Sequence, residues 1–243
     1  KVVRIRKSLR ELHADGMLVS ALDDIAWTLN LRGTDVHCNP VFVSYLLIES
    51  DKVSLFVDDN KLSPEVKQYL QDNQVSLYNY NKVEKCLESY SEYNILLDGD
   101  ETSYYLWKTV KCQEIVAAAS PIPAMKAVKN EAEIEGYRSA MLKDGVAMVK
   151  FLKWLKPAVE AGGQTEISID EKLTSLRAEQ KLFRDISFDT IAGYAQHGAI
   201  VHYEATPETD VVLKPEGLIL IDSGAQYQDG TTDITRTIAL GAV

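Results

Sequence analysis

The segment that decides the fold is Ile221-Asp-Ser-Gly-Ala-Gln-Tyr-Gln-Asp-Gly-Thr-Thr-Asp-Ile-Thr-Arg-Thr237. Asp222 ends an apolar run, and Asp233 follows eleven residues later in a β-prone run. Because strand side chains alternate between two faces, Asp233 and Thr235 are expected on one face and Ile234 on the other. Two carboxylates beside a buried strand repel each other and lose solvation unless a cation neutralises them. Their oxygen atoms favour a hard divalent metal such as manganese or magnesium.

The spacing of the two aspartates also constrains the hairpin. For them to face each other directly, the chain would have to reverse between Tyr227 and Gln228. A tight two-residue turn at Asp229-Gly230 would instead place Asp222 opposite Thr237. We therefore expect a wider loop in which a glycine supplies unusual backbone angles or a bulge, either Gly224 or Gly230. The spacing alone leaves a surface hairpin with solvated aspartates as the alternative.

Further stretches of the sequence accompany this hairpin. His202 stands twenty residues before Asp222. The stretches are Ala199-Ile-Val-His-Tyr203, Lys126-Ala-Val-Lys-Asn-Glu-Ala-Glu-Ile134 with Asp144-Gly145, Ser20-Ala-Leu-Asp-Asp-Ile-Ala-Trp-Thr-Leu-Asn-Leu-Arg-Gly33, and Asn39-Pro-Val-Phe42. Together with the hairpin they resemble the long, three-domain Xaa-Pro aminopeptidases (aminopeptidase P). These enzymes belong to the pita-bread metallopeptidases, with prolidase and methionine aminopeptidase.

The resemblance implies roles for three residues. Asp222 would bind one metal ion, Asp233 would bridge two, and His202 would lie beside the substrate, near the proline side of the cleaved bond. The implied cofactor is a pair of divalent metal ions, with Mn²⁺ as the expected identity. The family's other ligands, one histidine and two glutamates, would lie beyond Val243, and one of those glutamates would be the general base.

The implied fold is α/β, with two parts. Residues 1–120 would form a non-catalytic domain like the creatinase/prolidase N-terminal domain, and residues 121–243 the first half of a pita-bread (α+β) catalytic domain. The pattern agrees, because helices and strands alternate up to the prolines of Ser120-Pro-Ile-Pro123. Beyond them we expect a long helix capped at Asn130 and ending at Pro157, and a second helix from about 166 to 182. Four strands would follow, at residues 186–191, 199–203, 218–222 and 231–240.

Four side chains besides the two aspartates could carry chemistry. His202 would share a strand face with Ile200, so a hydrogen-bonded core histidine is its alternative interpretation. His197 would occupy a loop or line the pocket entrance. Thr235 would orient a carboxylate from behind the metal, or simply be a strand threonine. Arg236 would point to the opposite face and form a structural ion pair.

The composition excludes several classes of partner. A net charge of −10 argues against nucleic acid and anionic membranes. No apolar run approaches the ~18 residues of a membrane span. The three cysteines are odd in number and widely spaced, which predicts free thiols in the cytoplasm. The chain begins at Lys1 and ends soon after the hairpin, so both ends are expected to be cuts within a longer protein.

The functional hypothesis is a dimetal aminopeptidase that releases the N-terminal residue from peptides with proline in second position. This chain alone would be inactive, because it lacks several ligands. A prolidase-type Xaa-Pro dipeptidase and a non-catalytic pita-bread binding protein are the alternatives, and a homodimer of the complete protein stays open. Proline's tertiary amide has no N–H for an ordinary peptidase to bind, so a dedicated pocket is needed.

Overall fold

The computed structural model describes residues 1–243, which form two compact units. The first unit comprises residues 1–36 and 40–128, and the second comprises residues 129–243 together with 37–39. Helix α6 (Ile122–Ala127) follows the two prolines and packs against α2 (Leu22–Leu29) within the first unit. Lys126 of α6 donates a 2.7 Å hydrogen bond to Asp24 of α2. None of the helices is both long and apolar enough to cross a membrane.

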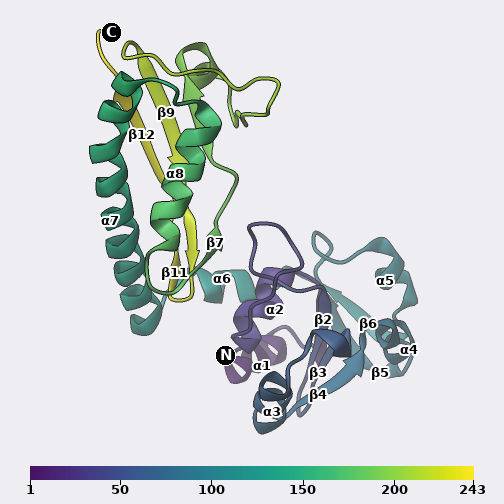
Figure 1. Ribbon diagram of the computed structural model, residues 1–243. Helices are drawn as coiled ribbons and strands as arrows, with labels where there is room; N and C mark the ends of the chain where they lie inside the picture. Colours follow the sequence, from purple (N-terminus) through teal and green to yellow (C-terminus); the bar gives the residue numbers. More distant parts are fainter. The chain divides into compact units, whose positions relative to one another are not determined.

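The first unit is built on a six-stranded mixed sheet with the order β4-β3-β2-β1-β5-β6 (Figure 1). Its strands are β1 (Gly16–Val19), β2 (Ser44–Glu49), β3 (Val53–Val57), β4 (Val75–Asn79), β5 (Tyr90–Leu97) and β6 (Cys112–Ala117). The strand β2 pairs antiparallel with β1 and β3, whereas the outer pairings, β3 with β4 and β5 with β6, are parallel. Strands β2 and β3 follow each other directly and form a hairpin.

Helices cover both faces of this sheet because the central strands are apolar on both faces. Leu46 and Leu55 enter one core with side chains of α1 to α3, while Leu47 and Phe56 enter a second core with α4 and α5. The helices are α1 (Val2–Glu11), α2, α3 (Pro64–Asp72), α4 (Val83–Leu87) and α5 (Tyr104–Thr109), with short 3₁₀ turns η1 (Asp59–Lys61) and η2 (Tyr80–Lys82). The predicted α/β fold of this part is confirmed.

In the second unit, two sheets of antiparallel strands pack against two helices, α7 (Glu131–Ala161) and α8 (Glu166–Ala178). Figure 1 shows α7 and α8 side by side in front of β9 and β12. One sheet has the order β12-β9-β8 and the other β11-β10-β7. The strands are β7 (Phe183–Ile186), β8 (Ile191–Tyr194), β9 (Leu218–Ser223), β10 (Ala225–Tyr227), β11 (Gly230–Thr231) and β12 (Ile234–Ala239). Phe151, Leu155, Leu173 and Ile221 belong to the shared core.

Helix α7 begins as predicted, with a capping box between Asn130 and Glu133, but it does not end at Pro157. It continues to Ala161 and stops at Gly162, whose φ of 87° is left-handed. An internal proline removes one backbone hydrogen bond. The buried side chain of Val159 shows that the apolar face continues past the proline, and this packing holds the last turn.

The predicted strand at 199–203 is wrong. Residues Ala195–Ala199 form the 3₁₀ helix η3, and a turn follows. Ala195 and His202 both have left-handed backbones, with φ of 50° and 55°. A strand requires negative φ, so this segment is not extended although its side chains favour β structure. Tertiary contacts, described below, determine its backbone conformation instead.

Candidate metal centre

The two aspartates lie on one hairpin, but in a different register from the expected one. Asp222 of β9 lies directly opposite Thr235 of β12. The chain reverses in a tight two-residue turn, since Tyr227 pairs with Gly230. The wider loop predicted from the sequence is therefore wrong. Asp233 precedes β12 and shares the Thr235 side, so it is a diagonal neighbour of Asp222, within reach on the same face.

Gly224 makes this arrangement possible. A Cβ atom there would lie 2.0 Å from the Thr232 carbonyl oxygen and 2.1 Å from Ser187 Oγ. In that space the Ser187 hydroxyl donates a 2.8 Å hydrogen bond to the Thr232 carbonyl. The Ala225 amide donates to Thr232 Oγ1 at 3.0 Å. The glycine thus serves a close backbone approach rather than unusual angles, and it fixes the residue that precedes Asp233.

The carboxyl groups of Asp222, which is half-buried, and Asp233, which is exposed, form an acidic pair without a basic partner. Loss of solvent around its carboxyl group, and then the neighbouring Asp222, raise the pKa of Asp233. Asp222 Oδ1 is buried and accepts no hydrogen bond. A buried carboxylate oxygen without a partner is costly, and no lysine or arginine forms an ion pair with either residue. These residues fit a divalent cation bound by hard oxygen ligands.

Of two neighbours of the pair, Thr235 fits its alternative as an ordinary strand threonine, and the ion pair predicted for Arg236 is absent. The Thr235 hydroxyl lies beside the pair in register, but it makes no hydrogen bond to Asp222. Arg236 forms no ion pair; its Nη1 donates a 2.7 Å hydrogen bond to the Thr235 carbonyl. Arg236 is exposed, so water satisfies its charge and a structural carboxylate partner is not needed.

His202 is exposed and lies in the turn after η3 rather than on a strand. No hydrogen bond or ion pair joins its side chain to Asp222 or Asp233. The Tyr203 amide closes the turn by donating to the Ile200 carbonyl at 3.3 Å. The expected face shared with Ile200 is wrong for the same reason as the strand, because the backbone at His202 is left-handed.

Sequence analysis missed the buried residue that holds this turn. Glu166, in the first turn of α8, is fully buried. Its carboxylate lies 3.0 Å from Nδ1 of His197 and accepts a 2.8 Å hydrogen bond from the Tyr203 hydroxyl. An acidic residue in the first turn of a helix is ordinary, so the sequence carries no signal of this role.

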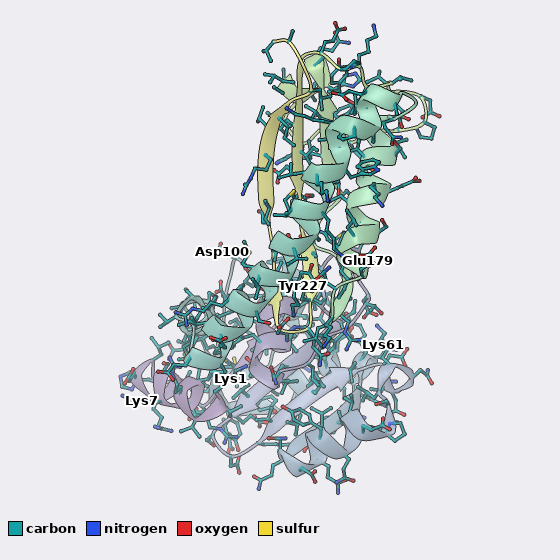
Figure 2. The ribbon with its side chains drawn as sticks, turned by 60° about the vertical axis from the view of Figure 1, so that its left-hand side comes forward. Lys1, Lys7, Lys61, Asp100, Glu179 and Tyr227 are labelled. Atoms are coloured by element: carbon teal, nitrogen blue, oxygen red, sulfur yellow. The ribbon has the colours of Figure 1, made fainter.

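The tip of the aspartate hairpin is anchored to α7. Tyr227 donates a 3.0 Å hydrogen bond to the fully buried Asp144, which also forms a buried ion pair with Arg177 of α8 at 2.8 Å. Figure 2 labels Tyr227 where the hairpin meets α7. Burial, and then the charge of Asp144, raise the pKa of Tyr227, which therefore stays protonated and acts as a donor. At the turn itself, Lys143 pairs with Asp229 at 2.6 Å.

One further group of side chains has the spacing of metal ligands. The ligand atoms of His37, Cys38 and Asp189 lie within 4.8 Å of one another. His37 Nε2 and Asp189 Oδ1 are 2.8 Å apart, and both side chains are mostly exposed. The hydrogen bond to Asp189 raises the pKa of His37. An exposed His–Asp ion pair accounts for this contact, so the two aspartates of the hairpin remain the candidate metal centre.

Comparison with known proteins places both units in described families. Residues 1–133 match the creatinase/prolidase N-terminal domain, and residues 135–243 match metallopeptidase family M24. Xaa-Pro aminopeptidase 1 of Dictyostelium discoideum is 40% identical over 99% of this chain. The chain covers 39% of that relative, so it spans well under half the length of the curated relatives it matches.

Two solved structures illustrate the likeness in fold. The X-prolyl aminopeptidase of Caenorhabditis elegans, described as a cytosolic enzyme with a di-nuclear active site, superposes with a TM-score of 0.92 at 31% identity. That match covers 98% of this chain and 40% of the other. The Xaa-Pro dipeptidase of Bacillus anthracis has a TM-score of 0.76 at 19% identity, over 99% of this chain and 64% of its own. The second likeness shows the fold alone.

Proposed function

Since the chain belongs to the creatinase/prolidase N-terminal domain family through residues 1–133, and its residues 135–243 match the M24 metallopeptidases, we propose that it is part of a metal-dependent Xaa-Pro aminopeptidase. The longer protein would release the N-terminal residue from peptides with proline in second position. The observation that carries the proposal is the acidic pair. Asp222 Oδ1 is buried without a hydrogen-bond partner, and partial loss of solvent together with the nearby Asp222 carboxyl group raises the pKa of Asp233.

In this proposal Asp222 and Asp233 hold divalent metal. A pair of bound ions would supply an activated water and polarise the carbonyl of the cleaved bond. This chain contributes two negatively charged side chains to the proposed metal site. The pairing of β9 with β12, in which Asp222 lies opposite Thr235, fixes the position of Asp222. The further ligands that the resemblance implies, one histidine and two glutamates, would come from other segments of the longer protein.

His202 is proposed as the residue that contacts the substrate. Its side chain is exposed, so it is free to meet a ligand. A neutral imidazole can donate one hydrogen bond, and a protonated one can stabilise negative charge that develops on the substrate oxygen. No hydrogen bond or ion pair joins it to either aspartate, which suits a role in binding rather than in holding metal.

The finer features of the proposal are the metal, the location and the domain roles. We propose Mn²⁺, because both ligands are carboxylates, and a cytoplasmic location, which the description of the C. elegans relative supports. Residues 1–120 would take no part in metal binding, and residues 121–243 would form the first half of the catalytic domain. Measurement of the longer protein's mass in solution tests whether it forms a homodimer.

The test is the longer protein with and without its acidic pair. The wild type should bind divalent metal and release the first residue of a tripeptide with proline in second position. Asp222→Asn with Asp233→Asn should lose both properties while the protein stays folded. Cleavage of Xaa-Pro dipeptides but not of longer peptides would favour a prolidase-type enzyme. Metal-free wild-type protein without turnover would favour a non-catalytic binding protein.

A further inference from the structure

Glu166 is a fully buried acidic group of the second unit that is not one of the candidate metal ligands. Its side chain is 0% exposed and has no lysine or arginine partner. Three groups surround the carboxylate: the Tyr194 amide at 2.7 Å, His197 Nδ1 at 3.0 Å and the Tyr203 hydroxyl at 2.8 Å. These three hydrogen bonds replace the water molecules that would solvate the Glu166 carboxylate if it were exposed.

The position of Glu166 makes this burial tolerable. It is the first residue of α8, where the free amides and the helix dipole favour negative charge. The helix itself is capped independently, because Thr165 and Ser168 form a reciprocal capping box with hydrogen bonds of 2.8 and 3.2 Å. The Glu166 side chain is thus not needed to start α8, and it is free to bind another segment.

All three donors belong to one segment, residues 194–203. Tyr194 ends β8, His197 lies in η3, and Tyr203 follows His202 directly. The rings of His197 and Tyr203 stack with centroids 4.4 Å apart. The carboxylate therefore ties the start, the middle and the end of the segment to one point.

The segment needs such an anchor because its backbone is unfavourable. Ala195 and His202 are both left-handed, with φ of 50° and 55°, and left-handed residues other than glycine persist only where their surroundings hold them. Gly193 and Gly198 are also in close contact, since a Cβ on Gly193 would lie 2.8 Å from the Gly198 nitrogen. No hydrogen bond or ion pair is made by the His202 side chain itself, so its place depends on its neighbours.

We propose that Glu166 is a positioning residue, which holds the left-handed turn so that the His202 imidazole is presented to the substrate. The inference rests on the proposed function, in which His202 contacts the substrate. Glu166 touches neither the substrate nor the metal; it acts through His197 and Tyr203. Its removal should therefore cost the contribution of His202 and nothing more.

A double-mutant cycle in the longer protein tests this. Glu166→Gln keeps the shape of the side chain but removes its charge and places an amide among three donors. We expect kcat/KM to fall by a factor similar to that of His202→Ala, with metal content unchanged. The variant that carries both changes should be no slower than His202→Ala alone, because Glu166 acts only by placing the His202 side chain against the substrate. Independent, multiplicative losses would overturn the inference.

Matched variants separate positioning from general stability. Thr165→Ala weakens the start of the same helix but leaves the carboxylate contacts in place, so its effect on kcat/KM should be small and should multiply with that of His202→Ala. His197→Asn keeps a donor for Glu166 and should retain most of the activity, whereas His197→Ala should resemble Glu166→Gln. Equal losses from Asn and Ala would contradict the proposed contact.

A readout without catalysis keeps the inference distinct from the proposed function. Amide hydrogen exchange should accelerate at residues 194–203 in Glu166→Gln, while β9 and β12 exchange as in the wild type. Unchanged exchange in the segment would overturn the positioning role. If the wild-type longer protein showed no turnover, the proposed function would fail, and the exchange measurement would still decide the role of Glu166.

Discussion

The Tyr227 hydroxyl donates a 3.0 Å hydrogen bond to Asp144, and this contact joins the hairpin of the candidate metal centre to the long helix α7. Asp144 is fully buried and also pairs with the fully buried Arg177. The hairpin therefore ends on a buried charge network rather than in solvent. This arrangement makes the aspartate hairpin sensitive to changes that lie well outside the metal centre.

We expect Asp144→Ala to be far more damaging than Tyr227→Phe. The first change leaves the Arg177 charge buried without a partner, which costs about 3–5 kcal/mol. The second removes one hydrogen bond from a carboxylate that keeps its arginine, which costs about 1–2 kcal/mol. Denaturant unfolding of both variants and the wild type measures the difference. Equal destabilisation by the two changes would contradict the network.

Gly224→Ala should abolish metal binding. The added Cβ would lie 2.0 Å from the Thr232 carbonyl oxygen, so the backbone beside Asp233 must move. Gly145→Ala is the matched control, because nothing lies within 4 Å of its added Cβ on α7. That control should be neutral or stabilise the protein by up to about 1 kcal/mol. Titration of both variants with Mn²⁺ checks the prediction, and normal binding by Gly224→Ala would refute it.

Asp233→Asn should impair the longer protein more thoroughly than His202→Ala. The asparagine lacks the negative charge proposed to bridge two metal ions, so metal content and activity should fall together. Loss of His202 should leave the metal in place and slow turnover by an amount equivalent to roughly 2.7–4 kcal/mol, as for a lost oxyanion donor. Metal analysis and rates are both required. An empty site in His202→Ala beside a loaded site in Asp233→Asn would reverse the roles.

The Lys143–Asp229 pair should stabilise the fold in a pH-dependent way. Burial opposes the shift, but the hydrogen bond from Lys143 prevails and lowers the pKa of Asp229 below its usual value of 3.8. A lowered folded-state pKa stabilises the protein above the unfolded-state value, and this stabilisation disappears as the pH falls through the folded-state value. Lys143→Met should therefore cost about 1 kcal/mol at pH 7. A gap from wild type that did not shrink below pH 4 would contradict this.

The isolated chain of 243 residues should bind divalent metal weakly and show no peptidase activity. Two carboxylates leave most positions of an octahedral ion to water. Calorimetric titration with Mn²⁺ and an assay on a tripeptide with proline in second position check both points. Turnover by the pure chain, at a rate comparable with that of the longer protein, would show that further ligands are not required.

The sequence predicted the features that arise from periodicity and from family resemblance. Leu46 and Leu47 fall in opposite cores because alternate strand residues point to opposite faces, and this gives a sheet with helices on both sides. The family resemblance is confirmed by the two domain matches. Both features depend on residue type and spacing along the chain, which are visible without coordinates.

The features that the sequence did not predict depend on tertiary contacts. The left-handed turn at His202 is held by Glu166, 36 residues earlier in the sequence, and no local pattern announces that contact. Pro157 should end α7 on local grounds, yet the buried face of the helix carries it on to Ala161. The register of the hairpin differs from the predicted one because Asp222 and Asp233 are diagonal neighbours and not directly opposite each other.

The tight turn between Tyr227 and Gly230 sets the register of the hairpin that carries the candidate metal centre. Side chains on a strand alternate, so a one-residue slip in the pairing of β9 with β12 would turn Asp222 and Asp233 to opposite faces. Substitutions within the turn leave that pairing unchanged. The pairing register is therefore as much a condition for the acidic pair as the two aspartates themselves.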